Sequence, residues 1–364
     1  MFKQFSRLWL KSLKQLVKAP ASRRTSAAKT APAGRKSVSR KAAAVCLATS
    51  DRWRRHTYVA GPDDVLAGVR AGRRIDYWLF RPSASASEPL PLLVMLHGCG
   101  QSAVEFASGT RMNRLAESQG FAVLYPQQAQ SAQRQRCWPW YRKEIQEGGG
   151  EARMITAIMR KVVAQHGFDP ARVYCAGLSA GAAMAHIIAL RYPQLVAAVA
   201  LHSGPMFGAA HSSVSGYGVM QHGSMQAPEK MLPLPNTDNG GEALTMPALL
   251  IHGRQDTVVR VVNLQQLEQQ FCALNRLTND QRSASVHHPA GRTKRSAQAY
   301  DTVDYRRGRK AILRVCRIDH LDHAWSGGDG ALRFNAARGP DASRMIWRFV
   351  SAHRRAAPLP TVAG

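Results

Sequence analysis

The sequence predicts an α/β fold with a largely parallel central sheet and helices on both faces. Two observations predict it: short apolar runs recur along the chain, and segments with helical periodicity separate them. Strands that alternate with helices form a parallel sheet through right-handed crossovers, and sites in such sheets lie at the carboxyl ends of the strands. The chain has 364 residues, 45% of them apolar, which is enough for one large buried core. No apolar run reaches the ~18 residues of a membrane span, so we expect no transmembrane helix.

The predicted strands are short and mostly apolar, and they span residues 75–80, 92–96, 121–125, 173–176, 196–201, 248–252 and 311–318. Pro126 is expected to close the third of them. The predicted helices span residues 152–165, 180–191, 262–274 and 342–353. The first helix carries one apolar stripe that includes Met154, Ile158 and Val162.

Two segments interrupt this alternation. Residues 205–247 are rich in Gly, Met, Ser, Pro and Asn and show weak periodicity, so we expect a long insertion over the sheet edge that forms a lid or substrate loop. Residues 283–309 are polar and basic, and we expect a surface excursion there. The sequence thus predicts one folded domain over residues 52–356, with a short disordered tail at 357–364.

The N-terminal segment is strongly basic. Residues 1–50 hold twelve Lys or Arg and no acid, so they contribute +12 of the formal net charge of +27. We expect residues 1–51 to be a mostly disordered tail, in which residues 5–17 form either a short basic amphipathic helix or no regular structure. Such a tail would attract a polyanion, an anionic membrane or a granule surface, and it contains no specific nucleic-acid motif. It shows no apolar run typical of a secretory signal, and none follows Arg23-Arg24.

Gly177-Leu178-Ser179-Ala180-Gly181 carries the strongest chemical signal in the sequence. This G-x-S-x-G motif follows a predicted strand and precedes a predicted helix, where a sharp turn raises the serine hydroxyl above the sheet and admits only small neighbours. The helix N-terminus behind the serine offers free N–H groups. We interpret Ser179 as a nucleophile; the alternative is a glycine-rich packing turn with an inert serine.

A nucleophilic serine needs a base, and in an α/β-hydrolase arrangement the acid and then the histidine follow the serine along the chain. Asp256 comes just after the strand at 248–252, where the acid belongs. There it would hold the imidazole of the base in one tautomer and stabilise the imidazolium. The alternative is an aspartate that caps the helix starting near Val262.

The base is His320 or His323, because both follow the strand at 311–318. We favour His323, since Gly327 and Gly328 after it let a loop fold toward the serine. Three further histidines end predicted strands, and we interpret them as structural hydrogen-bonding groups: His97, His202 and His252.

The tetrahedral intermediate of an acyl transfer needs two N–H donors, one from the residue after the nucleophile and one from the loop after an early strand. Ala180 supplies the first. Cys99, in the segment 97–101, is our choice for the second, with Gly100 as the alternative. We expect a structural role for the Cys99 side chain, because no base is placed to activate a cysteine nucleophile.

Several short motifs occur in a fixed order: His97-Gly98-Cys99-Gly100-Gln101, Tyr125-Pro126, Cys137-Trp138-Pro139-Trp140, Gly177–Gly181, His202-Ser203-Gly204, His252-Gly253 with Asp256, and His323–Gly328. Together they resemble the poly(3-hydroxybutyrate) (PHB) depolymerase family of esterases, which is related to feruloyl and acetylxylan esterases. The resemblance covers roughly residues 70–350 and implies an α/β-hydrolase fold, carboxylic-ester hydrolysis without a cofactor and an extracellular setting. Carried over by position, it supports Ser179, Asp256 and His323 as the triad and places Cys99 near the oxyanion hole. It also implies a disulfide between Cys99 and Cys137.

Two positions depart from the family pattern: Asp322 stands where members often have Gly, and Pro139 where they often have Asn. The tryptophans of two motifs, Trp138, Trp140 and Trp325, are candidates for an apolar acyl-binding wall, and core packing is the alternative for each. No metal-ligand motif, P-loop or dinucleotide fingerprint occurs, so we expect no cofactor and no metal.

The leading hypothesis is a serine carboxylic-ester hydrolase that forms an acyl-enzyme and acts on short hydroxyacyl esters or 3-hydroxybutyrate oligomers. A feruloyl or acetylxylan-type esterase is the close alternative. A module of hydrolase fold that binds a polyanion or granule surface is the alternative of another class, and a serine peptidase is a third. The resemblance implies an extracellular location, and a cytoplasmic or granule-associated one is the alternative.

Overall fold

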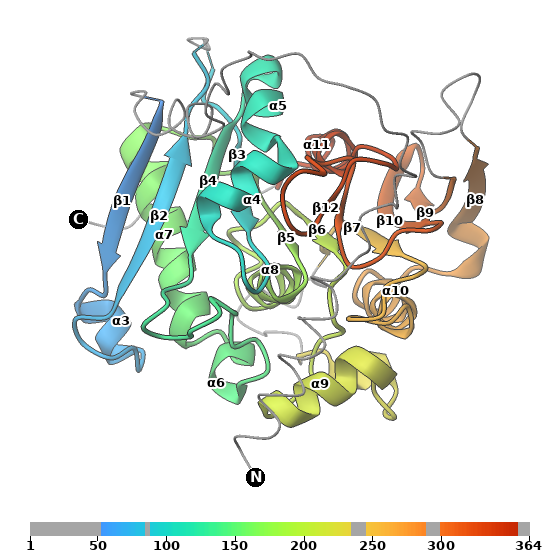
Figure 1. The fold of residues 1–364 in the computed structure, drawn as a ribbon, viewed down its shortest axis with the longest axis horizontal. Coiled ribbons are helices and arrows are strands. Elements are labelled where there is room, and N and C mark those ends of the chain that lie inside the picture. The colour runs from blue at the N-terminus through green and yellow to red at the C-terminus, as the bar shows by residue number, and fades with distance from the viewer. Residues whose placement is uncertain (1–51, 84–87, 234–244, 289–298, 356–364) are drawn as a thin grey trace, which may run out of the picture.

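The computed structural model describes residues 52–83, 88–233, 245–288 and 299–355. One ten-stranded sheet crosses them, in the spatial order β1 (Trp53–Val59), β2 (Arg74–Phe80), β4 (Ala122–Gln127), β3 (Leu92–Leu96), β5 (Val173–Leu178), β6 (Ala198–His202), β7 (Ala248–Gly253), β10 (Lys310–Ile318), β9 (Tyr300–Arg307) and β8 (Arg282–His287) (Figure 1). The strands from β4 to β10 in this order run parallel, and antiparallel strands extend both ends. The predicted largely parallel sheet is therefore confirmed. The tails predicted at 1–51 and 357–364 lie outside the described residues.

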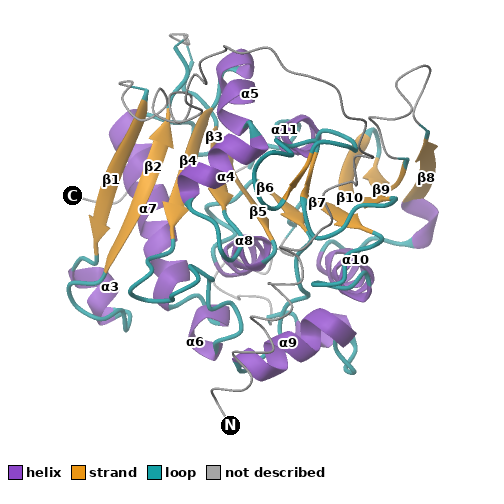
Figure 2. Cartoon of the chain, viewed as in Figure 1, coloured by secondary structure: helices purple, strands orange, loops and turns teal. Residues whose placement is uncertain are grey.

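Helices cover both faces of the sheet (Figure 2). One face packs against α7 (Gly150–His166), α8 (Ala180–Arg191) and α10 (Val262–Leu274), and the other against α4 (Ala103–Thr110), α5 (Met112–Gln119) and α11 (Ala342–Val350). The smaller elements are α3 (Pro62–Leu66), α6 (Lys143–Gln146), α9 (Ser213–His222), the 3-10 turns η1 (Pro228–Met231) and η3 (Asn279–Gln281), and the short strands β11 (Trp325–Ser326) and β12 (Asn335–Ala336).

Strand β3 is wholly apolar because it lies between the two hydrophobic cores of the protein. Leu92, Val94 and Leu96 belong to the core on the α8 side, whereas Leu93 and Met95 belong to the core on the α11 side. All five are fully buried. Because successive side chains of a strand point to opposite faces, a strand between two helix layers needs apolar residues at every position.

The surface excursion predicted at residues 283–309 is wrong for strands β8 and β9, which form there and extend the sheet. Residues 289–298 of the predicted excursion lie outside the described residues. The charged residues of β9, which make this segment unlike a typical strand in the sequence, form ion pairs with the neighbouring strand β10. Asp304 lies opposite Arg314 and accepts two hydrogen bonds of 2.6 Å from its guanidinium, and Asp301 lies opposite Arg317 at 3.4 Å. Such cross-strand ion pairs make a charged segment compatible with a sheet.

Pro126 does not close its strand, contrary to expectation. Strand β4 continues through it to Gln127, and Pro126 lies opposite Tyr77 of β2. The parallel pairing of β4 with β3 ends at Leu124. The N–H that proline lacks therefore falls where β3 no longer needs a donor.

The insertion predicted at 205–247 contains a regular element, the helix α9. This helix lies below α8 and α10 in Figure 1, beyond the carboxyl ends of the parallel strands. Its N-cap Ser212 accepts a hydrogen bond from Ser215 N–H at 3.1 Å. Four small residues within it, Ser213, Ser215, Gly216 and Gly218, weaken its helical periodicity in the sequence.

A buried histidine on α8 gives a stability prediction. His186 stacks on Phe271 with ring centroids 4.7 Å apart, and neither of its nitrogens has a partner among the described residues. Burial lowers the pKa of His186 to about 3. We expect His186→Leu to raise the free energy of unfolding by about 1–3 kcal/mol at pH 7.5, because it removes two unsatisfied polar atoms from the core.

The gain is expected to grow on acidification. The folded state keeps His186 neutral down to a pKa of about 3, whereas the unfolded chain binds a proton below about 6.5. Wild-type stability is therefore lost as pH falls from 6.5 toward 3, and at pH 5 this one group costs about 2 kcal/mol. Urea denaturation at pH 7.5 and pH 5 measures both terms, with the exposed His222→Leu as control. A variant less stable than the wild type at both pH values would contradict this account.

Candidate active site

Ser179 lies at the sharp turn between β5 and α8. Its backbone has φ 57° and ψ −120°, a region that residues other than glycine rarely adopt. The turn is tight because α8 packs directly on the sheet: a Cβ at Gly177 would lie 2.4 Å from the Gly181 backbone, and one at Gly181 would lie 2.0 Å from Leu96 O. Ser179 N–H donates to His202 O at 2.9 Å. Small residues on both sides therefore permit the strained serine that the G-x-S-x-G motif predicts.

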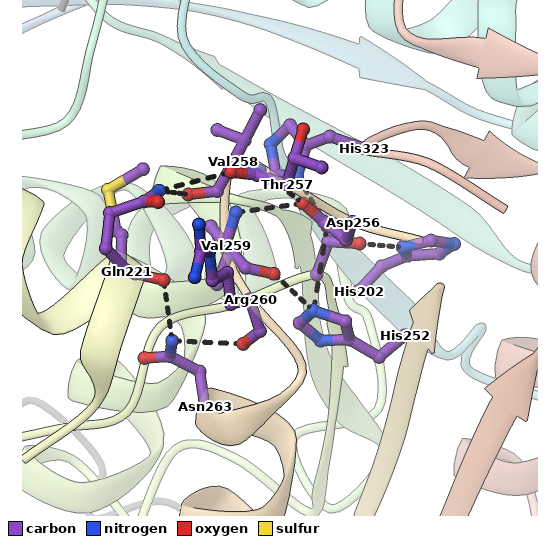
Figure 3. Close-up of polar contacts among 12 residues, drawn as sticks. His202, Gln221, His252, Asp256, Thr257, Val258, Val259, Arg260, Asn263 and His323 are labelled. Carbon is purple, nitrogen blue, oxygen red and sulfur yellow. Dashed lines mark hydrogen bonds and ion pairs between the residues drawn. The ribbon is translucent and has the colours of Figure 1, made fainter. Parts of the chain in front are cut away.

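Asp256 lies in the loop after β7, with its carboxylate buried. Its Oδ2 accepts a hydrogen bond from His323 Nδ1 at 2.7 Å, and its Oδ1 accepts from the N–H groups of Val258 (2.9 Å) and Val259 (2.8 Å) (Figure 3). Burial alone would raise the pKa of Asp256, but the charge and hydrogen bond of His323, with smaller contributions from a second histidine and a backbone N–H, lower it to about 2. Asp256 does not cap α10, whose N-cap is Val261.

The loop after β10 brings His323, and not His320, to the acid. This loop crosses the end of β7 so closely that a Cβ at Gly253 would lie 2.2 Å from Leu321 O. His323 is buried, whereas His320 is exposed and its Nδ1 lies 3.0 Å from Gln255 Nε2. The structure thus separates the two candidates for the base.

One pocket holds the candidate nucleophile, base and oxyanion donors. It encloses about 640 Å³ of space, its open mouth included. Its lining is Gly98, Cys99, Gln101, Trp140, Leu178, Ser179, Ala180, Pro205, Tyr217, Met220, Gln221, Val258, His323 and Phe334. Most of this lining is apolar or aromatic, which suits an acyl or aryl group.

The loop after β3 contributes residues to the pocket lining, and one of its N–H groups has no acceptor among the described residues. Gly98 N–H donates to Gln101 Oε1 at 2.9 Å, and Gly100 N–H donates to Gln135 O at 2.7 Å. The alternative donor Gly100 is therefore already engaged, while Cys99 N–H has no acceptor among the described residues. Ala180 opens α8, and its N–H likewise has no intrahelical acceptor.

A disulfide and a buried histidine hold this loop. Cys99 is bonded to Cys137, 38 residues further along the chain. Trp138 Nε1 donates to His97 O at 3.0 Å, and His97 Nε2 accepts from Gln128 N–H at 3.1 Å. Burial lowers the pKa of His97 to about 4, so the ring stays neutral and keeps this acceptor near pH 7.

The other two strand-end histidines also make fixed contacts. His202 Nε2 accepts from Ser326 N–H at 3.3 Å, and burial lowers the pKa of His202 to about 3. His252 Nε2 donates to Val259 O at 2.7 Å. Neither ring lines the pocket.

Two of the three tryptophans predicted to contact the acyl group do not. Trp140 lines the pocket. Trp138 and Trp325 are fully buried in the core, and the prediction is wrong for both. Trp325 stacks on His202 with ring centroids 5.1 Å apart and donates through Nε1 to Ser343 Oγ at 3.2 Å. Their polar atoms are satisfied inside the protein, as buried indole N–H groups require.

Several pocket residues escaped prediction from the sequence. Tyr217, Met220 and Gln221 come from α9, and Phe334 comes from the loop before β12. The one available signal is the position of the insertion, which follows β6 at the carboxyl ends of the strands. It indicates that the segment approaches the pocket, but not which side chains reach it.

No helix within 52–83, 88–233, 245–288 and 299–355 is long and apolar enough to cross a membrane. No three His, Cys, Asp or Glu side chains in the same ranges are grouped so that they would hold a metal ion.

The sequence matches the family model described as "Esterase PHB depolymerase" over residues 75–299. It is 35% identical over 184 residues to Poly(3-hydroxyalkanoate) depolymerase C of Paucimonas lemoignei, which covers 50% of this chain and 44% of that protein. It is 32% identical over 143 residues to Feruloyl esterase B of Thermothelomyces thermophilus, which covers 39% of this chain and 48% of that protein. The chain thus spans about half the length of these relatives.

Among solved structures, the chain is similar to an acetyl xylan esterase from Aspergillus awamori. The TM-score is 0.63 at 18% sequence identity, and the match covers 82% of this chain and 99% of the other. A likeness at this identity shows the fold, and the predicted α/β-hydrolase fold is confirmed.

Proposed function

The chain belongs to the family of PHB depolymerase esterases, and from this we propose that it is a serine carboxylic-ester hydrolase that works through an acyl-enzyme. One observation carries the proposal: Ser179 and His323 line the same pocket, and His323 Nδ1 lies 2.7 Å from the ionised Asp256. A serine, an imidazole and a buried carboxylate in this arrangement are the parts of an acyl-transfer triad.

In the proposed reaction, His323 takes the proton of the Ser179 hydroxyl as its oxygen attacks the ester carbonyl. The N–H groups of Cys99 and Ala180 stabilise the oxyanion of the tetrahedral intermediate. When that intermediate collapses, the C–O bond to the alcohol breaks, and the imidazolium returns the proton to the leaving alcohol. Water, deprotonated by His323, then attacks the acyl-enzyme and releases the acid. Asp256 holds the imidazole orientation in both halves of the cycle.

For the substrate class, we propose short hydroxyacyl esters, including oligomers of 3-hydroxybutyrate. The apolar lining from Trp140, Leu178 and Met220 supports an aliphatic acyl group, and one relative is named as a poly(3-hydroxyalkanoate) depolymerase. A feruloyl-type esterase is the second candidate. The aromatic rings of Tyr217 and Phe334 at the same pocket favour it, and another relative is named as a feruloyl esterase.

We propose an extracellular location, and the disulfide between Cys99 and Cys137 supports it. Disulfides persist in oxidising compartments and are rare in reducing ones. Binding of a polyanion or granule surface rests on residues 1–50, which lie outside the described residues, and stays a prediction from their charge.

A covalent probe tests the mechanism directly. We expect a fluorophosphonate to bond its phosphorus to Ser179 Oγ with loss of fluoride, which intact mass and peptide mapping detect, and to abolish hydrolysis of p-nitrophenyl butyrate. The labelled protein is then compared with a Ser179→Ala variant, which should take up no label. A label on another residue, or none on an active protein, would refute the serine mechanism.

A substrate panel tests the class. Turnover of 3-hydroxybutyrate trimer above that of methyl ferulate and acetylated xylo-oligosaccharide supports the hydroxyacyl proposal. The reverse order supports the second candidate.

A further inference from the structure

The loop that carries the acid, residues 256–260 and hereafter the acid loop, is held by side chains from three different elements. Each of its carbonyl groups from residue 257 to residue 260 accepts a side-chain hydrogen bond. The pairs are Thr257 O and Val258 O with Gln221 Nε2 (3.2 and 2.9 Å), Val259 O with His252 Nε2 (2.7 Å), and Arg260 O with Asn263 Nδ2 (3.1 Å) (Figure 3). His252 belongs to β7 and Asn263 to α10, both parts of the central layers, whereas Gln221 belongs to the insertion helix α9.

The two carbonyls held by Gln221 have a particular relation to the acid. A peptide group is planar and rigid, so the carbonyl of one residue and the N–H of the next move together. Thr257 O shares its peptide group with Val258 N–H, and Val258 O shares its peptide group with Val259 N–H. Those two N–H groups are the donors to Asp256 Oδ1. Gln221 therefore hydrogen-bonds to the carbonyl oxygens of the same two peptide groups whose N–H groups donate to the Asp256 carboxylate.

Gln221 also belongs to the wall of the pocket. Tyr217, Met220 and Gln221 on α9 line it, and so does Val258 on the acid loop. A second bond joins the same elements, because Arg260 N–H donates to Met220 O at 2.9 Å. The helix that lines the pocket is thus bonded directly to the loop that carries the acid.

We propose that Gln221 is a positioning residue for the ester hydrolysis proposed above. Its amide fixes the 257–258 and 258–259 peptide groups, these fix the Asp256 carboxylate, and the carboxylate fixes the imidazole of His323. Because Gln221 lies on α9, the alignment of the triad depends on where α9 sits against the acyl group. The inference rests on the proposed function and adds to it a residue whose hydrogen bonds go to the acid loop and not to Ser179 or His323.

The chain offers a matched control for this proposal. Gln266 on α10 is half-buried like Gln221, and it also ties the insertion down: its Nε2 donates to Ser224 O and its Oε1 accepts from Ser224 N–H, both at 2.8 Å. Its bonds reach neither the acid loop nor the pocket lining. A change at Gln266 therefore loosens the insertion without releasing the acid loop.

The test compares Gln221→Met, Gln221→Glu and Gln266→Met in the full chain, with p-nitrophenyl butyrate as substrate. Both Gln221 variants keep the length of the side chain but cannot donate to the two carbonyls at pH 8. We expect kcat to fall about 10- to 100-fold with KM within about threefold, because a misplacement of about 1 Å in a catalytic group has effects of this size. Gln266→Met should keep kcat within about threefold. Thermal unfolding of each variant establishes that it is folded.

A double-mutant cycle with Asp256→Asn separates positioning from general loosening. If Gln221 acts through Asp256, then Gln221→Met should change kcat less than about twofold when Asp256 is already replaced. An undiminished loss in that background, an equal loss in Gln266→Met, or an unchanged kcat in both Gln221 variants would overturn the inference. Failure of the proposed function is a different result, namely equal rates for the wild type and Ser179→Ala.

Discussion

Replacing Ser179 with alanine is expected to lower kcat/KM for p-nitrophenyl butyrate by about 10³-fold or more. In the proposed mechanism the variant lacks the oxygen that attacks the carbonyl, while the pocket and the proposed N–H donors of Cys99 and Ala180 remain. Steady-state kinetics measure the loss, and thermal unfolding measures whether the fold persists. Alanine suffers the same strain at φ 57° as serine, so stability should change little. If the Ser179→Ala variant kept its activity, Ser179 would not be the nucleophile.

Two further serine variants sharpen this result. Ser179→Gly should be equally inactive yet more stable by about 1 kcal/mol, because glycine adopts positive φ without strain. Ser203→Ala is the matched control: Ser203 is buried at the end of the adjacent strand β6 with φ 50°, but it does not line the pocket. We expect it to keep kcat/KM within about tenfold. If Ser203→Ala lost activity and Ser179→Ala kept it, the nucleophile would be Ser203 and not Ser179.

Replacing Gly181 with alanine is expected to destabilise the protein by about 3 kcal/mol or more, or to prevent its folding. The new Cβ would lie 2.0 Å from Leu96 O and 2.6 Å from His97 O, both of them backbone atoms that cannot rotate away. Either α8 or the end of β3 must move, and each leads to one of the two proposed oxyanion donors, Ala180 and Cys99. Activity should therefore fall further than the loss of folded protein explains. Soluble yield, urea denaturation and kcat/KM per folded molecule measure these effects.

A second glycine-to-alanine change provides the comparison. Gly218 lies in α9, and a Cβ there would meet no atom within 4 Å. Because alanine favours the helix more than glycine does, Gly218→Ala should stabilise the protein by about 0.5–1 kcal/mol. If both variants were equally stable, the close packing of α8 on β3 would not be the cause of the glycine at 181.

The sequence was sufficient where local pattern and chemistry coincide. The apolar run at 92–96 has the length of a strand between two layers and forms one, and the glycines around Ser179 predict a tight turn that the structure contains. The order of Ser179, Asp256 and His323 follows the order of β5, β7 and β10. Each of these inferences needs only neighbours along the chain and a general rule about parallel sheets.

Inference failed where long-range pairing decides the outcome. The charged strand β9 is stable because Asp304 meets Arg314 across the sheet, and that register is not visible within residues 283–309. Trp138 and Trp140 have the same local composition, yet one is enclosed in the core and the other lines the pocket. Gln221 gave no signal at all, because an isolated glutamine acquires its role from the loop that packs against it.

The placement of α9 bears on how the substrate selectivity of such enzymes can change. The segment between β6 and β7 leaves the sheet at one strand end and re-enters at the neighbouring strand, so its length and sequence can change without altering the strand register on which Ser179, Asp256 and His323 depend. Grafting a segment from a relative is thus a route to new acyl selectivity. The graft, however, would have to carry a hydrogen-bond donor at the place of Gln221, or selectivity would be exchanged at the expense of turnover.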